Sequence, residues 1–257
     1  MMKIRISWHK LKSILGLSLQ LAKAGFKLRN EGSYLGILWY LLDPLLMFVI
    51  LLSIRNIVGV DIENYPLYLL LGLIMFNFFR KTTSESTGVM IGNAGLIKSV
   101  NINHEVFVVS TVFKNIFSHF FEILLLILLL ILFNISPINV IFYPLIFAFF
   151  SFFVLGVSFV VSTIGTYFVD FARFWNVVTR VLWFATPIFY GANLDLPFNF
   201  NSLNPMYYFI KIARKIIIYN QIPRLWMIFG AILFSFILFF FGMFIFEKYK
   251  HKFAELV

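Results

Sequence analysis

The chain has 257 residues, of which 61% are hydrophobic and only 12% are charged, and its mean hydropathy is +0.93. Such a sequence has too little polar surface to cover a water-soluble globule, which excludes soluble enzymes and binding modules. Its long continuous apolar runs favour helices over a β-barrel, because each backbone group in lipid must be satisfied within its own segment. The sequence therefore predicts an all-α integral membrane protein, with a single domain over residues 1–257.

The formal net charge is +10, and there is no Cys. In a membrane protein, Lys and Arg gather on the cytoplasmic flanks of the spans, so this charge does not by itself indicate nucleic-acid binding. The lack of Cys excludes disulfides and thiolate metal sites.

Residues 1–30 predict an amphipathic helix in the cytoplasmic membrane interface, and not a signal peptide. Lys10, Lys23, Lys27 and Arg29 supply a cationic surface on this helix. The helix serves either as an anchor alone or also as a contact for a partner. Its apolar residues recur every three or four positions, at Trp8, Leu11, Leu15, Leu19, Ala22 and Phe26.

Six membrane-spanning helices are predicted between residues 35 and 246. The first begins at Leu35 or at Pro44 and ends near Val58. An Asp in lipid is costly, and we expect Asp43 to be an N-cap, with Pro44 as the first residue of a restarted helix.

The second span opens at Pro66 and carries a polar stretch that we expect to be buried against other helices or to reach the interface. Residues 91–104 form a cytoplasmic connection, residues 134–137 form the turn between spans three and four, and residues 247–257 form a cytoplasmic tail. Most of the 21 Lys and Arg then lie on the side of the two termini, which places both termini in the cytoplasm. The remaining spans are predicted at 106–133, 138–165, 175–190 and 225–246.

The segment 192–223 lies on the outer side and contains an amphipathic helix, with Asn204 as N-cap and Pro205 as its first residue. At 1.5 Å per residue this helix reaches about 22 Å, short of a hydrocarbon core of about 30 Å. It is therefore predicted to lie at the outer interface or to dip into it. Its apolar face is Met206, Phe209, Ile210, Ala213, Ile216 and Ile217, opposite Lys211, Arg214 and Lys215.

Two short matches to enzymatic motifs are interpreted as chance. His104-Glu105 begins like a zinc HExxH motif, but Val108 stands where the second His is needed. Residues 92–99 faintly resemble a phosphate loop, yet Ile97 replaces the Gly required before the Lys. The chain itself is not expected to hydrolyse nucleotide.

A set of ionisable residues lies on one face of the third predicted span. Lys114, Ser118 and Glu122 recur at intervals of four, with His119 beside them. They form either a proton pathway, as in an ion-coupled carrier, or a structural Lys–Glu pair near the cytoplasmic end.

Aromatic side chains are concentrated in the first and fifth predicted spans. Sugar C–H faces stack on aromatic rings, while Tyr and Trp keep a polar group for hydroxyls, so these residues are candidates for lining a glycan passage. The alternative is that they face lipid or form interface belts. The candidates are Trp39, Tyr40, Phe48, Trp183, Phe184, Phe189 and Tyr190.

Four stretches resemble the ABC-2-type permeases that export lipid-linked polysaccharides such as O antigen, capsule or teichoic acid. Together with the chain length, their order and spacing cover essentially the whole sequence. One departure is Phe168-Val169-Asp170, where the family often has Phe-Arg-Asp; Arg173, one turn later, is a candidate substitute. The stretches are YLGILWYLLDPLL, KSVNINHEVFVVSTVFKNIFSHFFE, FVDFARFWNVVTRVLWFATPIFY and NPMYYFIKIARKIIIYN.

The resemblance implies a non-enzymatic half-transporter in the cytoplasmic (inner) membrane. Two copies would form a pore lined by spans one and five, and two separate ATPase subunits, which hold the ATP and Mg, would bind from the cytoplasm. This chain would bind no cofactor, metal or nucleic acid itself. The rival predictions are an ABC-2 exporter of a drug or small lipid, and a proton-coupled carrier that uses Lys114 and Glu122.

The resemblance also assigns roles to three further sets of residues. The basic residues of the N-terminal helix, Lys23, Lys27 and Arg29, would attract the diphosphate of an undecaprenyl-linked glycan. The connection at 91–104 would couple to the ATPase through Asn93, Leu96, Ile97, Lys98 and Asn101. The outer segment would form a gate that includes Pro205, Tyr207, Tyr208 and Arg214.

Overall fold

The computed structural model describes residues 8–32, 34–55, 61–191 and 204–257. The predicted end of the first span at Val58 and the first part of the outer segment at 192–223 lie outside these ranges. Within them all regular secondary structure is helical, as predicted, and there is no strand. The helices are α1 (Trp8–Asn30), α2 (Trp39–Ser53), α4 (Tyr65–Thr87), α5 (Val89–Gly92), α6 (Ala94–Ser99), α7 (Glu105–Leu132), α8 (Tyr143–Tyr167), α9 (Phe171–Ala185), α11 (Pro205–Ile217), α12 (Leu225–Tyr249) and α13 (Phe253–Leu256), with 3-10 turns at Gly36–Leu38, Pro137–Phe142 and Lys250–Lys252.

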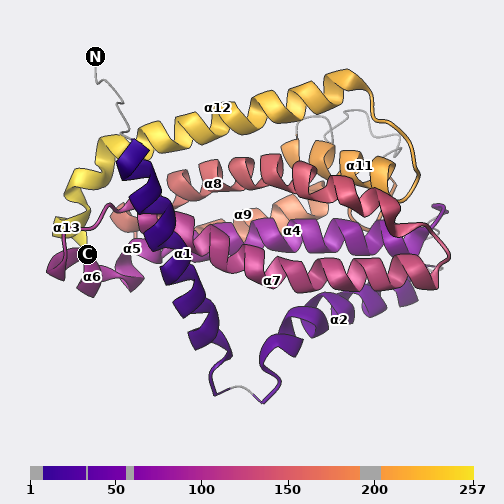
Figure 1. Ribbon diagram of the computed structural model, residues 1–257, viewed down its shortest axis with the longest axis horizontal. Coiled ribbons are helices and arrows are strands. Elements are labelled where there is room, and N and C mark those ends of the chain that lie inside the picture. Colours follow the sequence, from indigo (N-terminus) through magenta and orange to yellow (C-terminus); the bar gives the residue numbers. More distant parts are fainter. Residues whose placement is uncertain (1–7, 33, 56–60, 192–203) are drawn as a thin grey trace.

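The long helices lie side by side along the longest axis of the molecule (Figure 1). Helices α4, α7, α8 and α12 form this bundle, and α1 crosses it at a steep angle. The short helices α5, α6 and α13 gather at one end of the bundle, and α11 lies toward the other. The placement of α1 in the membrane interface stays a prediction.

Three helical segments are long and apolar enough to cross a membrane by length and composition: Glu105–Leu132, Pro137–Tyr167 and Leu225–Leu256. They correspond to the third, fourth and sixth predicted spans. Helix α2 is apolar but shorter. Helix α9 ends at Ala185, before Pro187, instead of continuing to Tyr190 as predicted.

Helix α4 is the centre of the bundle. Its residues Leu67 to Leu71 are almost completely buried, and it packs against α2, α7, α8, α9 and α11. Pro66 stands in its first turn, as predicted. A helix that is apolar on all sides over its first half must be covered on all sides, which explains this central position.

Helices α8 and α12 are in backbone contact. A Cβ added at Gly156 would collide with the backbone of Leu238, and a Cβ added at Gly242 would collide with the carbonyl of Gly156. Small residues at such crossings let membrane helices approach closely and gain dispersion contacts.

The prediction of an N-cap at Asp43 is wrong. Helix α2 begins at Trp39 and continues through Pro44. The Oδ2 atom of Asp43 lies 3.2 Å from Nζ of Lys81, so this carboxylate is satisfied by an ion pair with α4 instead of by a helix end. Pro44 lies near the start of the helix, where its missing N–H leaves only the carbonyl of Tyr40 without its usual partner.

Helix α1 contacts the bundle through small and apolar residues, of which Ala22 belongs to its predicted stripe and the other two lie beside it. Ile14, Ser18 and Ala22 are buried, and the Ser18 hydroxyl donates to the carbonyl of Val106 over 3.2 Å. Leu11, Leu15 and Leu19 remain exposed. An exposed apolar stripe is what a helix in the membrane interface requires.

Candidate functional site

A groove of about 580 Å³ lies between α2, α4 and α9. It combines charged, amide and aromatic side chains, which suits a ligand that has both polar groups and apolar faces. Its lining residues are Asp43 and Met47 from α2, Leu73, Asn77 and Arg80 from α4, and Asn176, Thr179, Arg180, Trp183 and Phe184 from α9.

Two polar contacts fix α9 against α4. The indole Nε1 of Trp175 donates to Oγ1 of Thr83 over 3.0 Å, and the hydroxyl of Ser84 donates to Oδ1 of Asn176 over 3.1 Å. The indole contact is partly buried and the hydroxyl contact is exposed, so the indole contact contributes more to the register of the two helices, because an unpaired buried donor costs free energy. Arg80 and Arg180 line the groove, and neither has an ion pair with a carboxylate in the described part of the chain.

Beside its groove-lining face, α9 carries a largely exposed apolar stripe that ends at Phe184, which also lines the groove. Phe174, Val177, Val181 and Phe184 recur at helical spacing, and each is more than half exposed. The groove therefore lies next to an apolar surface of α9 that the rest of the described chain leaves largely exposed.

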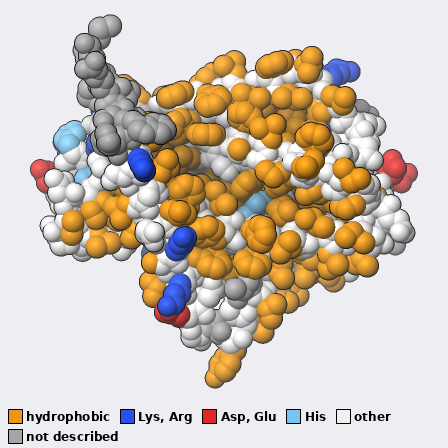
Figure 2. All heavy atoms as spheres, in the orientation of Figure 1, with side chains coloured by type: hydrophobic (Ala, Val, Ile, Leu, Met, Phe, Trp, Pro, Cys, Tyr) orange, Lys and Arg blue, Asp and Glu red, His pale blue; other side chains and the backbone are white. Residues whose placement is uncertain are grey.

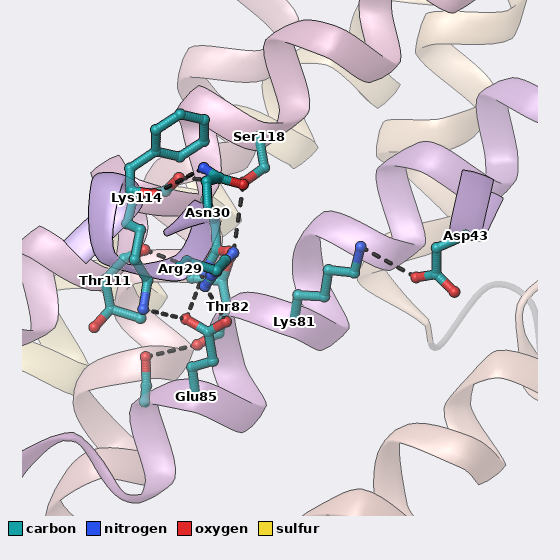
Figure 3. A network of polar contacts seen from close by, with 12 residues as sticks. Arg29, Asn30, Asp43, Lys81, Thr82, Glu85, Thr111, Lys114 and Ser118 are labelled. Atoms are coloured by element: carbon teal, nitrogen blue, oxygen red, sulfur yellow. Dashed lines mark hydrogen bonds and ion pairs between the residues drawn. The ribbon is translucent and has the colours of Figure 1, made fainter. Parts of the chain in front are cut away.

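A polar network next to the groove joins α1, α4 and α7 (Figure 3). Glu85 of α4 accepts from the guanidinium of Arg29 and lies 2.9 Å from Nζ of Lys114. The amide of Asn115 donates over 3.2 Å to Oε2 of Glu85, the oxygen that also faces Lys114, and Arg29 donates to Oδ1 of Asn115 over 3.2 Å and to Ser118 over 3.5 Å. One carboxylate thus holds two cations, and the network ties the end of α1 to the bundle.

The predicted Lys114–Glu122 pair is wrong, because each residue has a different partner. Lys114 pairs with Glu85, while Glu122 lies 2.8 Å from Nδ1 of His119. The other ring nitrogen of His119 lies 2.7 Å from the hydroxyl of Tyr143, and these three side chains are buried. Glu85 was missed in the sequence, where its position in the polar stretch TTSEST was the available signal.

The seven predicted channel aromatics fall into two groups. Trp183, Phe184, Phe189 and Tyr190 form one continuous cluster, in which the rings of Trp183 and Phe189 stack at 5.1 Å. The remaining three lie on α2: Trp39 is exposed, Phe48 is in the core, and Tyr40 stacks on Phe26 of α1.

The cations of the N-terminal helix are placed differently from one another. Lys23 is exposed, and Lys27 is exposed and lies 3.7 Å from Glu31. Arg29 is directed into the Glu85 network, so its charge is already paired.

The predicted coupling segment, residues 91–104, begins at the end of α5 and contains α6, at one end of the bundle. Leu96 and Lys98 are exposed, as is Asn101 beyond the helix. Ile97 is buried in a small apolar cluster with Phe253 of α13, and the Asn93 amide donates to the carbonyl of Val89 over 2.7 Å. Ile97 and Asn93 therefore support the segment from within.

The outer helix α11 begins as predicted, with Asn204 accepting from the N–H of Met206 over 3.0 Å and Pro205 as its first residue. The expectation that Arg214 lies on its polar face is wrong, since this residue is buried. Its guanidinium donates to the carbonyl oxygens of Tyr68, Pro187 and Ile188.

The remaining predicted gate residues lie near the surface of α11. The rings of Tyr207 and Tyr208 are 5.3 Å apart, and Lys211 Nζ lies 2.5 Å from the hydroxyl of Tyr207. Arg214 thus fastens α11 to α4 and to the segment after α9, while the two Tyr remain partly accessible.

Three helices long and apolar enough to cross a membrane, packed around a polar, aromatic-lined groove, define a multi-pass helical membrane protein. No family model matches the chain. Over 97% of its length it is 28% identical to an O-antigen export system permease protein RfbA of Klebsiella pneumoniae, 98% of which is covered. A second K. pneumoniae protein of that name is 27% identical over the full length of both chains, and one from Myxococcus xanthus is 24% identical over 94% of this chain and 95% of its own. These likenesses confirm the resemblance to ABC-2-type polysaccharide-export permeases.

Proposed function

We propose that this chain is the membrane subunit of an ABC transporter that exports an undecaprenyl-linked polysaccharide, O antigen or similar, across the cytoplasmic membrane. The groove between α2, α4 and α9 is the observation that carries the proposal. Its Trp183 and Phe184 rings offer stacking surfaces for sugars, and its Asn and Arg side chains offer donors for hydroxyl or acidic groups. The names of the full-length relatives agree with this cargo.

A second copy of the chain would close the groove into a passage. The uncovered stripe at Phe174, Val177, Val181 and Phe184 borders the groove and supports such a homodimer, since an apolar face beside a polar groove fits a self-complementary contact. In this arrangement both termini lie in the cytoplasm. The six spans are α2, α4, α7, α8, the segment from α9 to Tyr190, and α12.

Energy would come from a separate ATPase, which holds ATP and Mg, docked at the α5–α6 end. Exposed Ile91, Leu96 and Val100 give this end an apolar surface, and Ile97 anchors it to α13. Helix α4 lines the groove and leads directly into α5 and α6. A displacement of α6 would therefore be transmitted to the groove through α4.

The proton-coupled carrier is less well supported. It requires Lys114 and Glu122 to act together, whereas Lys114 is paired with Glu85 and Glu122 with His119. Export that persists in a Glu122→Gln variant and stops without the ATPase would exclude it.

The dimer is tested by disulfide cross-linking, for which the chain is suited because it has no Cys. Single Cys substitutions at Val177, Val181 and Phe184 should give a cross-linked dimer in membranes under mild oxidation. Leu233→Cys on α12 is the matched control, since Leu233 and Val181 are both 62% exposed. Cross-linking at Leu233 alone would place the dimer elsewhere and remove the closed passage.

The cargo is tested by deleting the chain from its host. Surface polysaccharide should disappear while undecaprenyl-linked polymer accumulates on the cytoplasmic side, and the wild-type chain should restore export. Unchanged surface polysaccharide would contradict the proposal.

Coupling to the ATPase is tested with Leu96→Glu, which should leave ATP hydrolysis running without export. The control is Leu256→Glu, at a similarly exposed site of the same end of the molecule, which should keep the two processes coupled.

A further inference from the structure

A second, larger hollow lies on another face of the molecule, between α1, α7, α8 and α12. Its volume is about 610 Å³, and its lining is almost entirely apolar, including Ile14, Val112, Phe152 and Met243. Figure 2 shows this face, which is covered mainly by hydrophobic side chains, with Lys and Arg along α1. None of its lining residues belongs to the candidate groove, so the hollow does not depend on the proposed function.

The hollow has the length of one lipid leaflet. Along α7 it extends from Glu105 to Ile116, which at 1.5 Å per residue is about 16 Å. The hydrocarbon core of a bilayer is about 30 Å thick, so one leaflet contributes about half of that. One extended acyl chain, parallel to α7, fits this length.

Charged residues stand at one end of the hollow only. Nζ of Lys250 lies 2.6 Å from Oε1 of Glu105 and 2.7 Å from Oε2 of Glu247. Two carboxylates therefore share one ammonium. Glu105 is 3% exposed, lines the hollow, and its Oε2 atom has no hydrogen-bond partner among the described residues.

A buried carboxylate oxygen without a donor, beside an excess negative charge, calls for a further cation that carries N–H groups. A primary ammonium satisfies both requirements. A quaternary ammonium has no N–H to donate, and a lipid phosphate or diphosphate alone would be repelled by the two carboxylates.

We propose that this hollow binds one acyl chain of a membrane phospholipid whose headgroup carries a primary ammonium, such as phosphatidylethanolamine, with the ammonium at Glu105 and Glu247. The bound lipid would fill the space between α1 and the bundle and complete the hydrogen bonds of Glu105.

The test is native mass spectrometry of the purified full-length protein, titrated with phosphatidylethanolamine, phosphatidylglycerol and phosphatidylcholine of identical chains, and with undecaprenyl phosphate. Phosphatidylethanolamine should bind about 10-fold more tightly than the other three lipids, because one charge-assisted hydrogen bond contributes enough free energy for that difference in affinity. Glu247→Gln should abolish this preference. Glu255→Gln, which removes an exposed carboxylate at the same end of the molecule, should keep it.

Occupation of the hollow is tested independently by Ala148→Phe. Ala148 lines the hollow and is exposed, so the larger ring fills the space without disturbing the core. It should weaken binding of the ethanolamine lipid, whereas Leu128→Phe at an exposed site of α7 should not.

Three results would overturn the proposal. Equal binding of all lipids by the wild-type protein would remove the role of the ammonium. Unchanged binding in Ala148→Phe would remove the hollow as the site, and this measurement stands even where Glu247→Gln fails to fold. Tightest binding of undecaprenyl phosphate would assign the hollow to a carrier lipid instead.

Discussion

Replacing Arg214 should destabilise the protein more than any change at a neighbouring surface residue. The side chain donates to three buried carbonyl oxygens, at 3.1 Å from Nε to Tyr68, 2.7 Å from Nη1 to Pro187 and 3.0 Å from Nη2 to Ile188. Hydrogen bonds from a charged donor contribute about 1.5–3 kcal/mol each, so Arg214→Ala should cost about 4 kcal/mol or more. The guanidinium also lies 3.3 Å from the centre of the Tyr68 ring, which adds a cation–π contact.

The conservative variant separates charge from geometry. Arg214→Lys keeps the positive charge, but a compact ammonium cannot reproduce the planar guanidinium that reaches three carbonyls. This variant should therefore lose about half as much free energy of unfolding as Arg214→Ala. Thermal unfolding of the purified protein, followed by Trp fluorescence, measures both changes. At about 2–4 °C per kcal/mol, Arg214→Ala should lower Tm by about 8–16 °C.

The matched control is Lys215→Gln, at the next residue of α11, which is only partly buried. It should change stability by no more than about 0.5 kcal/mol. An Arg214→Ala protein that unfolds at the same temperature as Lys215→Gln would refute the reasoning, because the three carbonyls would then find other donors at no cost.

Three further predictions concern other contacts. Glu85→Gln should weaken the attachment of α1 and lower the free energy of unfolding by about 2–3 kcal/mol, measured by thermal unfolding. A double-mutant cycle with Arg29→Gln should show strong coupling. Additive losses of stability in the double mutant would contradict the network. Gly242→Val should push α12 away from Gly156 and lower stability by at least about 1–3 kcal/mol in the same assay, and an unchanged Tm would show that the two helices are not in backbone contact. Trp183→Ala should reduce surface polysaccharide several-fold at unchanged protein level, since one stacking contact contributes about 0.5–1.5 kcal/mol; normal export would remove this ring from the passage.

Local sequence signals predicted some helix ends correctly, although the Asp43 cap and the end of α9 were wrong. The Asn204-Pro205 pair caps α11 as expected, and the turn after α7 lies at Asn134, whose φ of 56° suits the left-handed tolerance of Asn. The long apolar segments were predicted for the same reason, since length and hydropathy are properties of a segment by itself.

Pairings between helices could not be read from the sequence. Asp43 looked like a cap because its partner Lys81 is 38 positions away, and Arg214 looked like a surface residue because its three acceptors are backbone atoms of distant segments. Lys114 and Glu122 lie on one face of α7 but eight positions apart, and Lys114 pairs with Glu85 of α4 while Glu122 pairs with His119, one turn away on its own helix. Helical periodicity indicates which residues share a face of a helix, but not which residues of other segments pack against that face.

The central position of α4 limits how the protein can move. Its first half is enclosed on every side, while its second half holds Asp43 through Lys81 and Arg29 through Glu85. It cannot tilt alone without opening the core or breaking these ion pairs. Any force applied at the α5–α6 end must therefore shift α1, α2 and the groove wall together, so that this end of the bundle and the proposed passage change shape in one step.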